Sequence, residues 1–217
     1  MVKAVIFDFD GLLVDTEIIA YQIYKEILDE FGHEFSIEEY AQTYSGKTEI
    51  KNVTHLIEQY RLPWTLEEGI QKVLLIEKRL LARGVALKGG AMDLLPFLKE
   101  NGYKIALATS SKADRALSIL NEHSITNYFG EFVFAEDIQK GKPDPEVFLK
   151  ACEKLGERPE DCLVLEDSEA GIQAANAAGI PVICVPDMKR PSQRVLDRAA
   201  AVLDSLDQVI QYLSEEV

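Results

Sequence analysis

Two aspartates, Asp8 and Asp10, stand two residues apart at the end of the first apolar run of the chain. Successive side chains of a strand point to opposite faces, so both carboxylates can point the same way while Phe9 enters the core. Carboxylates this close repel each other and stay ionised only when a positive group lies near them. The pair is therefore a candidate nucleophile, acid/base group or metal site; the alternative is a strand that ends in an ordinary Asp-Gly turn.

Three hydroxyl residues, Thr109, Ser110 and Ser111, end a later apolar run and precede a helix expected from about Lys112. The free backbone N–H groups and the positive dipole end of a helix N-terminus suit a phosphate group. The alternative is that one of these hydroxyls caps the helix.

Lys142 lies in the segment Gly141-Lys142-Pro143-Asp144-Pro145. Two prolines stiffen such a loop, so the ammonium can be held in one direction, where it would neutralise a phosphate and nearby carboxylates. A solvated lysine in a loop before a helix, with Pro145 as the first helical residue, is the alternative.

A second acid pair, Glu166-Asp167, ends another apolar run and is followed by Ser168. Carboxylate oxygens suit Mg²⁺, which takes few protein ligands and keeps several waters. The alternative is that Asp167 or Ser168 caps the next helix.

All four sets follow short apolar runs that we expect to form strands. The expected strands are 4–9, 104–109, 132–135, 163–165 and 182–185, with a weaker sixth run around Val202. Helical patterns at 91–101, 146–155 and 170–178 separate the later runs, which predicts βαβ units and a buried parallel sheet. Ligands of such sheets bind beyond the carboxyl ends of the strands. The four sets should therefore converge on one crevice, and together they fit phosphoryl transfer.

The stretch from 15 to 83 contains helical periodicity and no convincing strand. Ser36 and Thr65 each begin a Ser/Thr-x-x-Glu pattern that is typical of a capping box, so each should open a helix. We expect an α/β core formed by 1–14 and 86–217, with an all-helical unit at 15–85 inserted after the first strand.

The composition limits the partners of the chain. Its 217 residues carry a net charge of −14, which argues against a nucleic-acid or anionic-membrane surface. No run approaches the ~20 apolar residues of a membrane span, and the first apolar run is too short for a signal peptide. Three cysteines without CxxC spacing predict reduced thiols rather than disulfides. We expect a cytoplasmic monomer.

The segment Asp8-Phe9-Asp10-Gly11-Leu12-Leu13-Val14-Asp15-Thr16-Glu17 resembles the first motif of the haloacid dehalogenase-like hydrolases. Thr109, Lys142 and Glu166-Asp167 are similar to the second, third and fourth motifs of that superfamily. The resemblance covers essentially the whole chain and is strongest to the branch of β-phosphoglucomutases and small-molecule phosphatases. It implies a Rossmann-like parallel α/β core flanked by helices, with an inserted small helical cap domain.

By this resemblance, Asp8 attacks phosphorus to form an aspartyl-phosphate. Asp10 protonates the leaving alcohol and later activates water. Mg²⁺ would be held by the Asp8 carboxylate, the Asp10 main-chain carbonyl and Asp167, with Glu166 as a ligand or an outer partner.

The same resemblance assigns phosphate binding to Thr109 and the Ser110 amide, with Lys142 offsetting the phosphate charge. Gly46 and Lys47, in the expected cap, are candidate substrate contacts, although a solvated helix face is the alternative for Lys47.

The resulting hypothesis is a Mg²⁺-dependent phosphatase, a phosphoric monoester hydrolase, that acts on a small phosphorylated metabolite such as a sugar phosphate. A phosphosugar mutase is the alternative. The mutase branch, however, carries a histidine at the position of Ala20. It also carries an arginine after a Gly-x-Ser turn in the cap, where this chain has Gly46-Lys47-Thr48-Glu49. A catalytically silent binding protein on the same fold is a third hypothesis, which the presence of Asp8, Asp10 and Lys142 disfavours.

Overall fold

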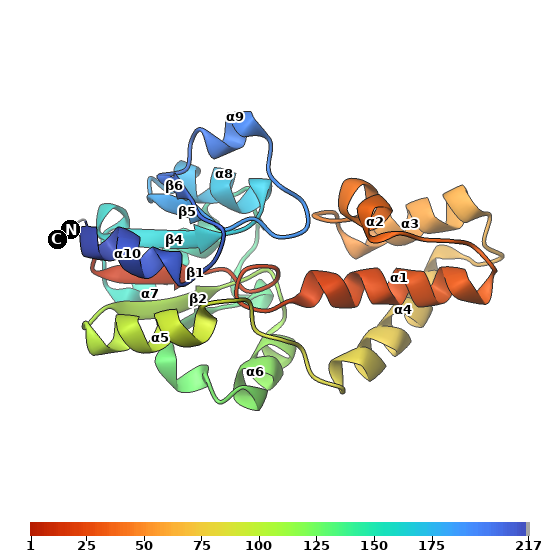
Figure 1. The fold of residues 1–217 in the computed structure, drawn as a ribbon, viewed down its shortest axis with the longest axis horizontal. Coiled ribbons are helices and arrows are strands. Elements are labelled where there is room, and N and C mark those ends of the chain that lie inside the picture. The colour runs from red at the N-terminus through yellow and green to blue at the C-terminus, as the bar shows by residue number, and fades with distance from the viewer. Residues whose placement is uncertain (216–217) are drawn as a thin grey trace. The chain divides into compact units, whose positions relative to one another are not determined.

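The computed structural model describes residues 1–215 and divides into two compact units (Figure 1). Met1–Asp15 and the chain from Ala86 onward form the first unit, and Thr16–Val85 forms the second. The first unit contains the whole sheet, and the second is built from helices. Among residues 1–215, every helix is too short or too polar to span a lipid bilayer.

The sheet of the first unit has six parallel strands. They are β1 (Ala4–Phe7), β2 (Lys104–Ala108), β3 (Glu131–Val133), β4 (Cys162–Glu166), β5 (Val182–Cys184) and β6 (Ala201–Val202). The apolar residues of β1, β2 and β4 are all buried, as expected of a sheet covered on both faces. The predicted parallel α/β core is confirmed, and the weak run around Val202 forms β6.

The strand order is β3-β2-β1-β4-β5-β6. After β1 the chain builds outward through β2 and β3, and it then crosses to the other side of β1 to build β4, β5 and β6. Phe7, the last residue of β1, pairs with Leu107 of β2 and Leu165 of β4. The carboxyl ends of these three strands therefore lie together where the strand order reverses, which is the usual ligand position in such sheets.

Helices cover both faces of the sheet. They are α5 (Ala91–Glu100), α6 (Ala113–Glu122), α7 (Glu146–Leu155), α8 (Glu169–Ala177), α9 (Gln193–Leu196) and α10 (Gln208–Glu215), with short 3₁₀ turns η1 (Thr126–Tyr128), η2 (Ala135–Asp137) and η3 (Pro159–Asp161). Alternate strand residues such as Ile6, Ala106 and Val164 share one buried cluster with side chains of α7 and α8. Helix α5 packs on β2 and α10, and Figure 1 shows α5 and α10 on the near side of the sheet.

The third strand is the clearest difference in element bounds. We expected it at 132–135, but β3 ends at Val133 and residues Ala135–Asp137 form η2. The Asp137 carboxylate accepts the Phe134 N–H at 2.9 Å, so a local side-chain bond replaces continuation of the strand.

The second unit consists of α1 (Thr16–Glu30), α2 (Ile37–Thr43), α3 (Glu49–Tyr60) and α4 (Leu66–Leu81). The Thr65 capping box is complete, because the Thr65 hydroxyl accepts the Glu68 N–H and the Glu68 carboxylate accepts the Thr65 N–H. Ser36 makes the first of these bonds, to the Glu39 N–H, so both predicted helix starts are confirmed. The interior is aromatic: Tyr24, Tyr40 and Tyr44 pack ring against ring and are nearly fully buried.

Candidate active site at the carboxyl edge of the sheet

Asp8 and Asp10 follow β1 in a tight turn. The Asp8 N–H donates to the Leu165 carbonyl at 3.0 Å and so continues the β1–β4 pairing. Gly11, with φ of +83°, closes the turn, and Phe9 is fully buried. Asp8 is buried, whereas the Asp10 side chain is 33% exposed. The turn thus gives the two carboxylates different surroundings, because Asp8 is shielded from solvent and Asp10 is partly open to it.

Lys142 lies against two carboxylates. Its ammonium contacts Asp8 Oδ1 and lies 2.6 Å from Glu166 Oε1. The side chains of Lys142, Asp8 and Glu166 are 9%, 10% and 1% exposed. The ammonium also lies 4.8 Å from the centre of the Phe148 ring, a favourable cation–π position. Lys142 is therefore a buried partner of the acids and not the solvated lysine of the alternative interpretation.

The loop that carries Lys142 is fixed by Glu146, the first residue of α7. The Glu146 carboxylate accepts the N–H groups of Gln139, at 3.0 Å, and of Lys140, at 2.9 Å. It also pairs with the Lys150 ammonium at 2.8 Å. These bonds lower the pKa of Glu146 to about 2, with the Lys150 hydrogen bond as the largest cause. Side-chain anchoring therefore adds to the proline stiffness that the sequence suggested.

Glu166 is the last residue of β4, and Asp167 follows it directly. Glu166 Oε2 accepts the N–H of Ser168 at 2.8 Å and its hydroxyl at 2.9 Å. The Ser168 hydroxyl in turn accepts the Gly171 N–H at 3.1 Å and caps α8. Ser168 thus performs the capping role considered in the sequence, so Asp167 is left to face the other acids.

Asp8, Glu166 and Asp167 each offer an oxygen, and these three atoms lie within 4.8 Å of one another. Burial raises the pKa of Asp8 to about 7, against the lowering effect of Lys142. Burial, followed by the charges of Glu166 and Asp8, also raises the pKa of Asp167 well above its ordinary range. The pKa of Lys142 is raised because the attraction of Asp8 and Glu166 outweighs burial.

Three clustered acids facing one ammonium leave a negative excess in a buried place. Burial of like charges without a counter-charge is costly, and hard oxygen donors at this spacing suit a small divalent cation. The donor set therefore fits Mg²⁺.

Thr109 and Ser110 follow β2, the strand that pairs with β1, and Asp8 follows β1. Thr109 is 1% exposed, and its hydroxyl accepts the Ser111 N–H at 2.9 Å. The N-cap position of α6 is Lys112, which makes no side-chain cap bond, so the capping alternative does not describe these hydroxyls. Ser110 is exposed.

Arg115 was not anticipated from the sequence. Its guanidinium donates to Asp10 Oδ1 at 2.7 Å and to the Ser111 hydroxyl at 2.8 Å, and that hydroxyl donates to Asp10 Oδ2 at 2.5 Å. Arg115 lies in the first turn of α6, and Ser111 lies in the loop two residues before that helix begins. Both oxygens of Asp10 are therefore held by α6 and the loop before it.

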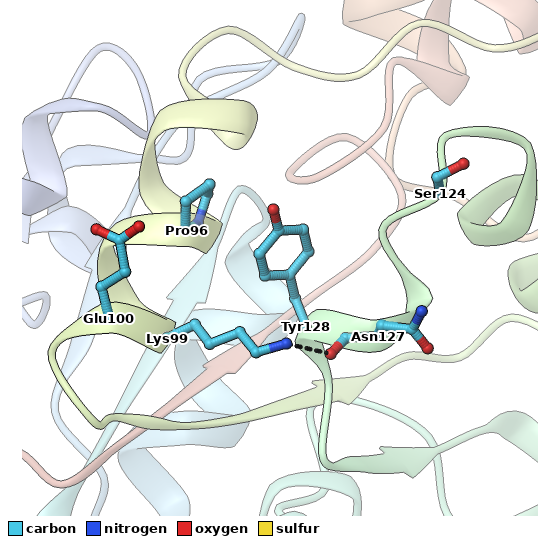
Figure 2. A pocket seen from close by; sticks show the side chains of 6 residues that line it. All are labelled: Pro96, Lys99, Glu100, Ser124, Asn127 and Tyr128. Atoms are coloured by element: carbon cyan, nitrogen blue, oxygen red, sulfur yellow. Dashed lines mark hydrogen bonds between the residues drawn. The ribbon is translucent and has the colours of Figure 1, made fainter.

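A surface hollow of about 340 Å³ lies elsewhere on the first unit, between α5 and η1 (Figure 2). Figure 2 shows Lys99 reaching the Asn127 carbonyl, at 3.2 Å, beside the Tyr128 ring. Helix α5 ends just before β2 begins, and η1 just before β3. The hollow therefore borders the amino ends of the strands, opposite to the acids, and it presents none of the predicted site residues.

A family model described as haloacid dehalogenase-like hydrolase matches residues 5–185. The chain belongs to this hydrolase family. A phosphorylated carbohydrates phosphatase of Thermotoga maritima is 32% identical to the hydrolase over 214 residues, which cover 98% of this chain and 99% of the relative.

Two further likenesses extend the comparison. A β-phosphoglucomutase of Bacillus subtilis is 30% identical over 99% of the hydrolase and 95% of its own length. The crystal structure of a haloacid dehalogenase family hydrolase from Deinococcus radiodurans, with bound phosphate and sodium, superposes with a TM-score of 0.86. It is 28% identical over 99% of this chain and 96% of that one. The family and fold predicted from the motifs are confirmed, and the relatives include both a phosphatase and a mutase.

The predicted substrate contacts of the hydrolase lie in its second unit. Gly46 and Lys47 form the turn between α2 and α3, where Gly46 has a φ of +74° and Lys47 is exposed. Ala20 lies on α1 and Glu49 begins α3. Contact between these residues and a substrate stays a prediction.

Proposed function

We propose that this hydrolase is a Mg²⁺-dependent phosphatase of a small phosphorylated metabolite, with a sugar phosphate as the favoured class. The observation that carries the proposal is the cluster of Asp8, Glu166 and Asp167, with the Lys142 ammonium against Asp8 and Glu166. The similarity to a phosphorylated carbohydrates phosphatase of Thermotoga maritima supports the substrate class.

In the proposed reaction, Asp8 attacks the phosphorus atom and forms an aspartyl-phosphate while the alcohol leaves. Asp10 gives its proton to the leaving oxygen and then takes one from the water that cleaves the intermediate. The bonds from Arg115 and Ser111 orient the Asp10 carboxyl for this exchange.

The phosphate would be held by the Thr109 hydroxyl, the Ser110 amide and the Lys142 ammonium. Mg²⁺ would be held by Asp8, the Asp10 carbonyl and Asp167, with Glu166 as a ligand or an outer partner. When bound, the ion supplies positive charge that stabilises the transferring phosphoryl group. Residues 15–85 would act as the cap of the core formed by 1–14 and 86–217. Gly46 and Lys47 would touch the substrate, and a cap that excludes bulk water favours small substrates over phosphoproteins.

The test is release of inorganic phosphate over a panel of phosphorylated metabolites, with Mg²⁺ and with a chelator. Asp8→Asn should abolish release, while the matched control Asp93→Asn, an exposed acid in the first turn of α5, should keep it. Rapid quenching should trap phosphate on the wild-type protein in a form that hydroxylamine cleaves. Equal rates for wild type and Asp8→Asn would refute the mechanism.

A phosphosugar mutase is the second candidate, favoured by the similarity to the β-phosphoglucomutase of Bacillus subtilis. Ala20 and Glu49 in place of the histidine and arginine of that branch support hydrolysis instead. Incubation with β-glucose 1-phosphate, Mg²⁺ and a bisphosphate primer separates the two activities. Glucose 6-phosphate formed faster than free phosphate would establish the mutase.

A further inference from the structure

Asp187 is a buried carboxylate that the proposed mechanism does not use. It follows β5 by three residues, at the same edge of the sheet as the other acids, and its side chain is 7% exposed. Oδ1 accepts a hydrogen bond from the Lys88 ammonium at 2.6 Å. Oδ2 is buried and has no hydrogen-bond partner among the described residues. A buried carboxylate oxygen without a hydrogen bond destabilises the folded protein. We therefore expect a partner for this atom from outside the protein chain.

The unpartnered oxygen lies beside the proposed metal ligand Asp167. A Cβ atom built on Gly11 would lie 2.6 Å from Asp167 Oδ2 and 3.1 Å from Asp187 Oδ2. Both oxygens therefore lie next to the position that a Gly11 side chain would occupy, and the absence of that side chain leaves room for them. The negative charge of Asp187 is also among the causes, after burial and the nearer acids, that raise the pKa of Asp167.

Lys88 fixes Asp187 from the other side. The Lys88 N–H donates to the Leu13 carbonyl at 2.9 Å, and the neighbouring Leu87 pairs with Val14. The backbone of Lys88 is thus tied to the segment that follows Asp8 and Asp10. Lys88 therefore occupies Oδ1 alone, and Oδ2, the oxygen that lies near Gly11 and Asp167, remains open to a partner outside the chain.

We propose that Asp187 is a positioning residue of the metal site, whose free oxygen accepts hydrogen bonds from water bound to the cation. This inference rests on the proposed function, because it requires a cation at Asp8 and Asp167. Mg²⁺ keeps several waters when protein carboxylates bind it, and those waters need acceptors. Outer partners of this kind orient a metal site and strengthen its affinity by about 10- to 100-fold.

A purely mechanical role is the competing explanation: the Lys88–Asp187 ion pair would join the loop after β5 to the turn after β1. The two roles differ in what each partner contributes. A mechanical link fails equally when either side chain is removed. A water-binding role needs the Asp187 carboxylate and tolerates loss of the lysine, which adds no acceptor.

The experiment measures Mn²⁺ binding to the full chain without substrate, by EPR of the free ion, so its readout is independent of turnover. Asp187→Asn should weaken binding about tenfold. Lys88→Met should bind with wild-type affinity, and Asp93→Asn controls for the loss of one negative charge. Urea unfolding in chelator establishes that each variant is folded.

The outcomes separate this inference from the proposed function. Wild-type affinity in Asp187→Asn, or an equal weakening in Lys88→Met, would overturn the role of Asp187. If Asp167→Asn also left Mn²⁺ binding unchanged, the proposed metal site itself would be wrong. Loss of binding in Asp167→Asn, with Asp187→Asn normal, would leave the phosphatase proposal standing and remove only the inference on Asp187.

Discussion

Replacement of Lys142 by methionine removes the ammonium that lies between Asp8 and Glu166. Methionine has a similar length and keeps contact with the Phe148 ring, so the change isolates the charge. The variant leaves the clustered oxygens of Asp8, Glu166 and Asp167 without this counter-charge, in a place where the Asp8 and Glu166 side chains are buried.

The expected cost follows from that burial. Removing one partner of a buried ion pair typically destabilises a protein by about 3–5 kcal/mol, because an uncompensated charge stays inside. The pKa of Asp8 is about 7, raised by burial from 3.8. The folded protein therefore binds the Asp8 proton more tightly than the unfolded chain does. The stability that this proton contributes is fully present below pH 3.8, the pKa in the unfolded chain, and is lost as the pH rises through about 7. The loss caused by Lys142→Met should therefore be largest at pH 8 and smaller at pH 5.

The assay is urea unfolding in chelator at both pH values, followed by circular dichroism. Lys140→Met is the matched control, because Lys140 lies in the same loop, is 75% exposed and is 3.9 Å from Asp144. Such a surface pair is worth less than about 1 kcal/mol. Addition of Mg²⁺ should restore part of the stability of Lys142→Met, since the ion replaces the missing positive charge.

Equal unfolding midpoints for Lys142→Met and Lys140→Met at pH 8 would refute this reasoning. So would a loss for Lys142→Met that grows as the pH falls, because protonation of the acids must relieve their repulsion.

Three further predictions concern the residues around the cluster. Glu146→Gln should be less stable than wild type in urea at pH 6, and the difference should narrow as the pH falls from 4.5 toward 2, since a carboxyl with a pKa lowered to about 2 loses its contribution there; a constant difference would contradict the assigned anchoring. Arg115→Met should lower kcat by about 10- to 100-fold with little change in KM, because it orients Asp10 rather than the substrate; steady-state kinetics that show a raised KM alone would contradict this. Gly171→Ala should cost about 1–3 kcal/mol in urea unfolding, because its Cβ would meet Glu166 Oε1 at 1.7 Å; unchanged stability would show that Glu166 can move freely.

Most of the first unit was predictable from the sequence, because its physical signals are local. Strands buried on both faces leave continuous apolar runs, and helix α7 was predicted at its observed bounds, 146–155, between a proline and a glycine. The position of Asp8, Lys142 and Glu166 at or after strand ends predicts that they lie near one another. Their contact through one ammonium confirms the convergence, while their catalytic roles stay predictions.

Other partners could not be predicted because their signals are not local. Arg115 and its partner Asp10 lie 105 residues apart in the sequence, and Lys88 and its partner Asp187 lie 99 residues apart. Nothing in the charge pattern of either helix or loop specifies such a pairing; the register of the sheet and the helix docking decide it. Asp187 followed the same strand-end rule as the other acids, but as a single acid after β5 it gave a weak signal.

The chain leaves the first unit and returns to it at neighbouring points. The Asp15 N–H donates to the Ala86 carbonyl at 2.8 Å, and Val14 pairs antiparallel with Leu87. For the folding of the sheet, the segment between Asp15 and Ala86 acts as one closed loop. Each doubling of the length of a flexible loop adds only about 0.6 kcal/mol to the entropic cost of closing it. Segments of very different length can therefore be joined at Asp15 and Ala86 with little effect on the strand ends. We expect chimeras that carry a different insertion between Asp15 and Ala86 to keep the candidate active-site edge of the sheet unchanged.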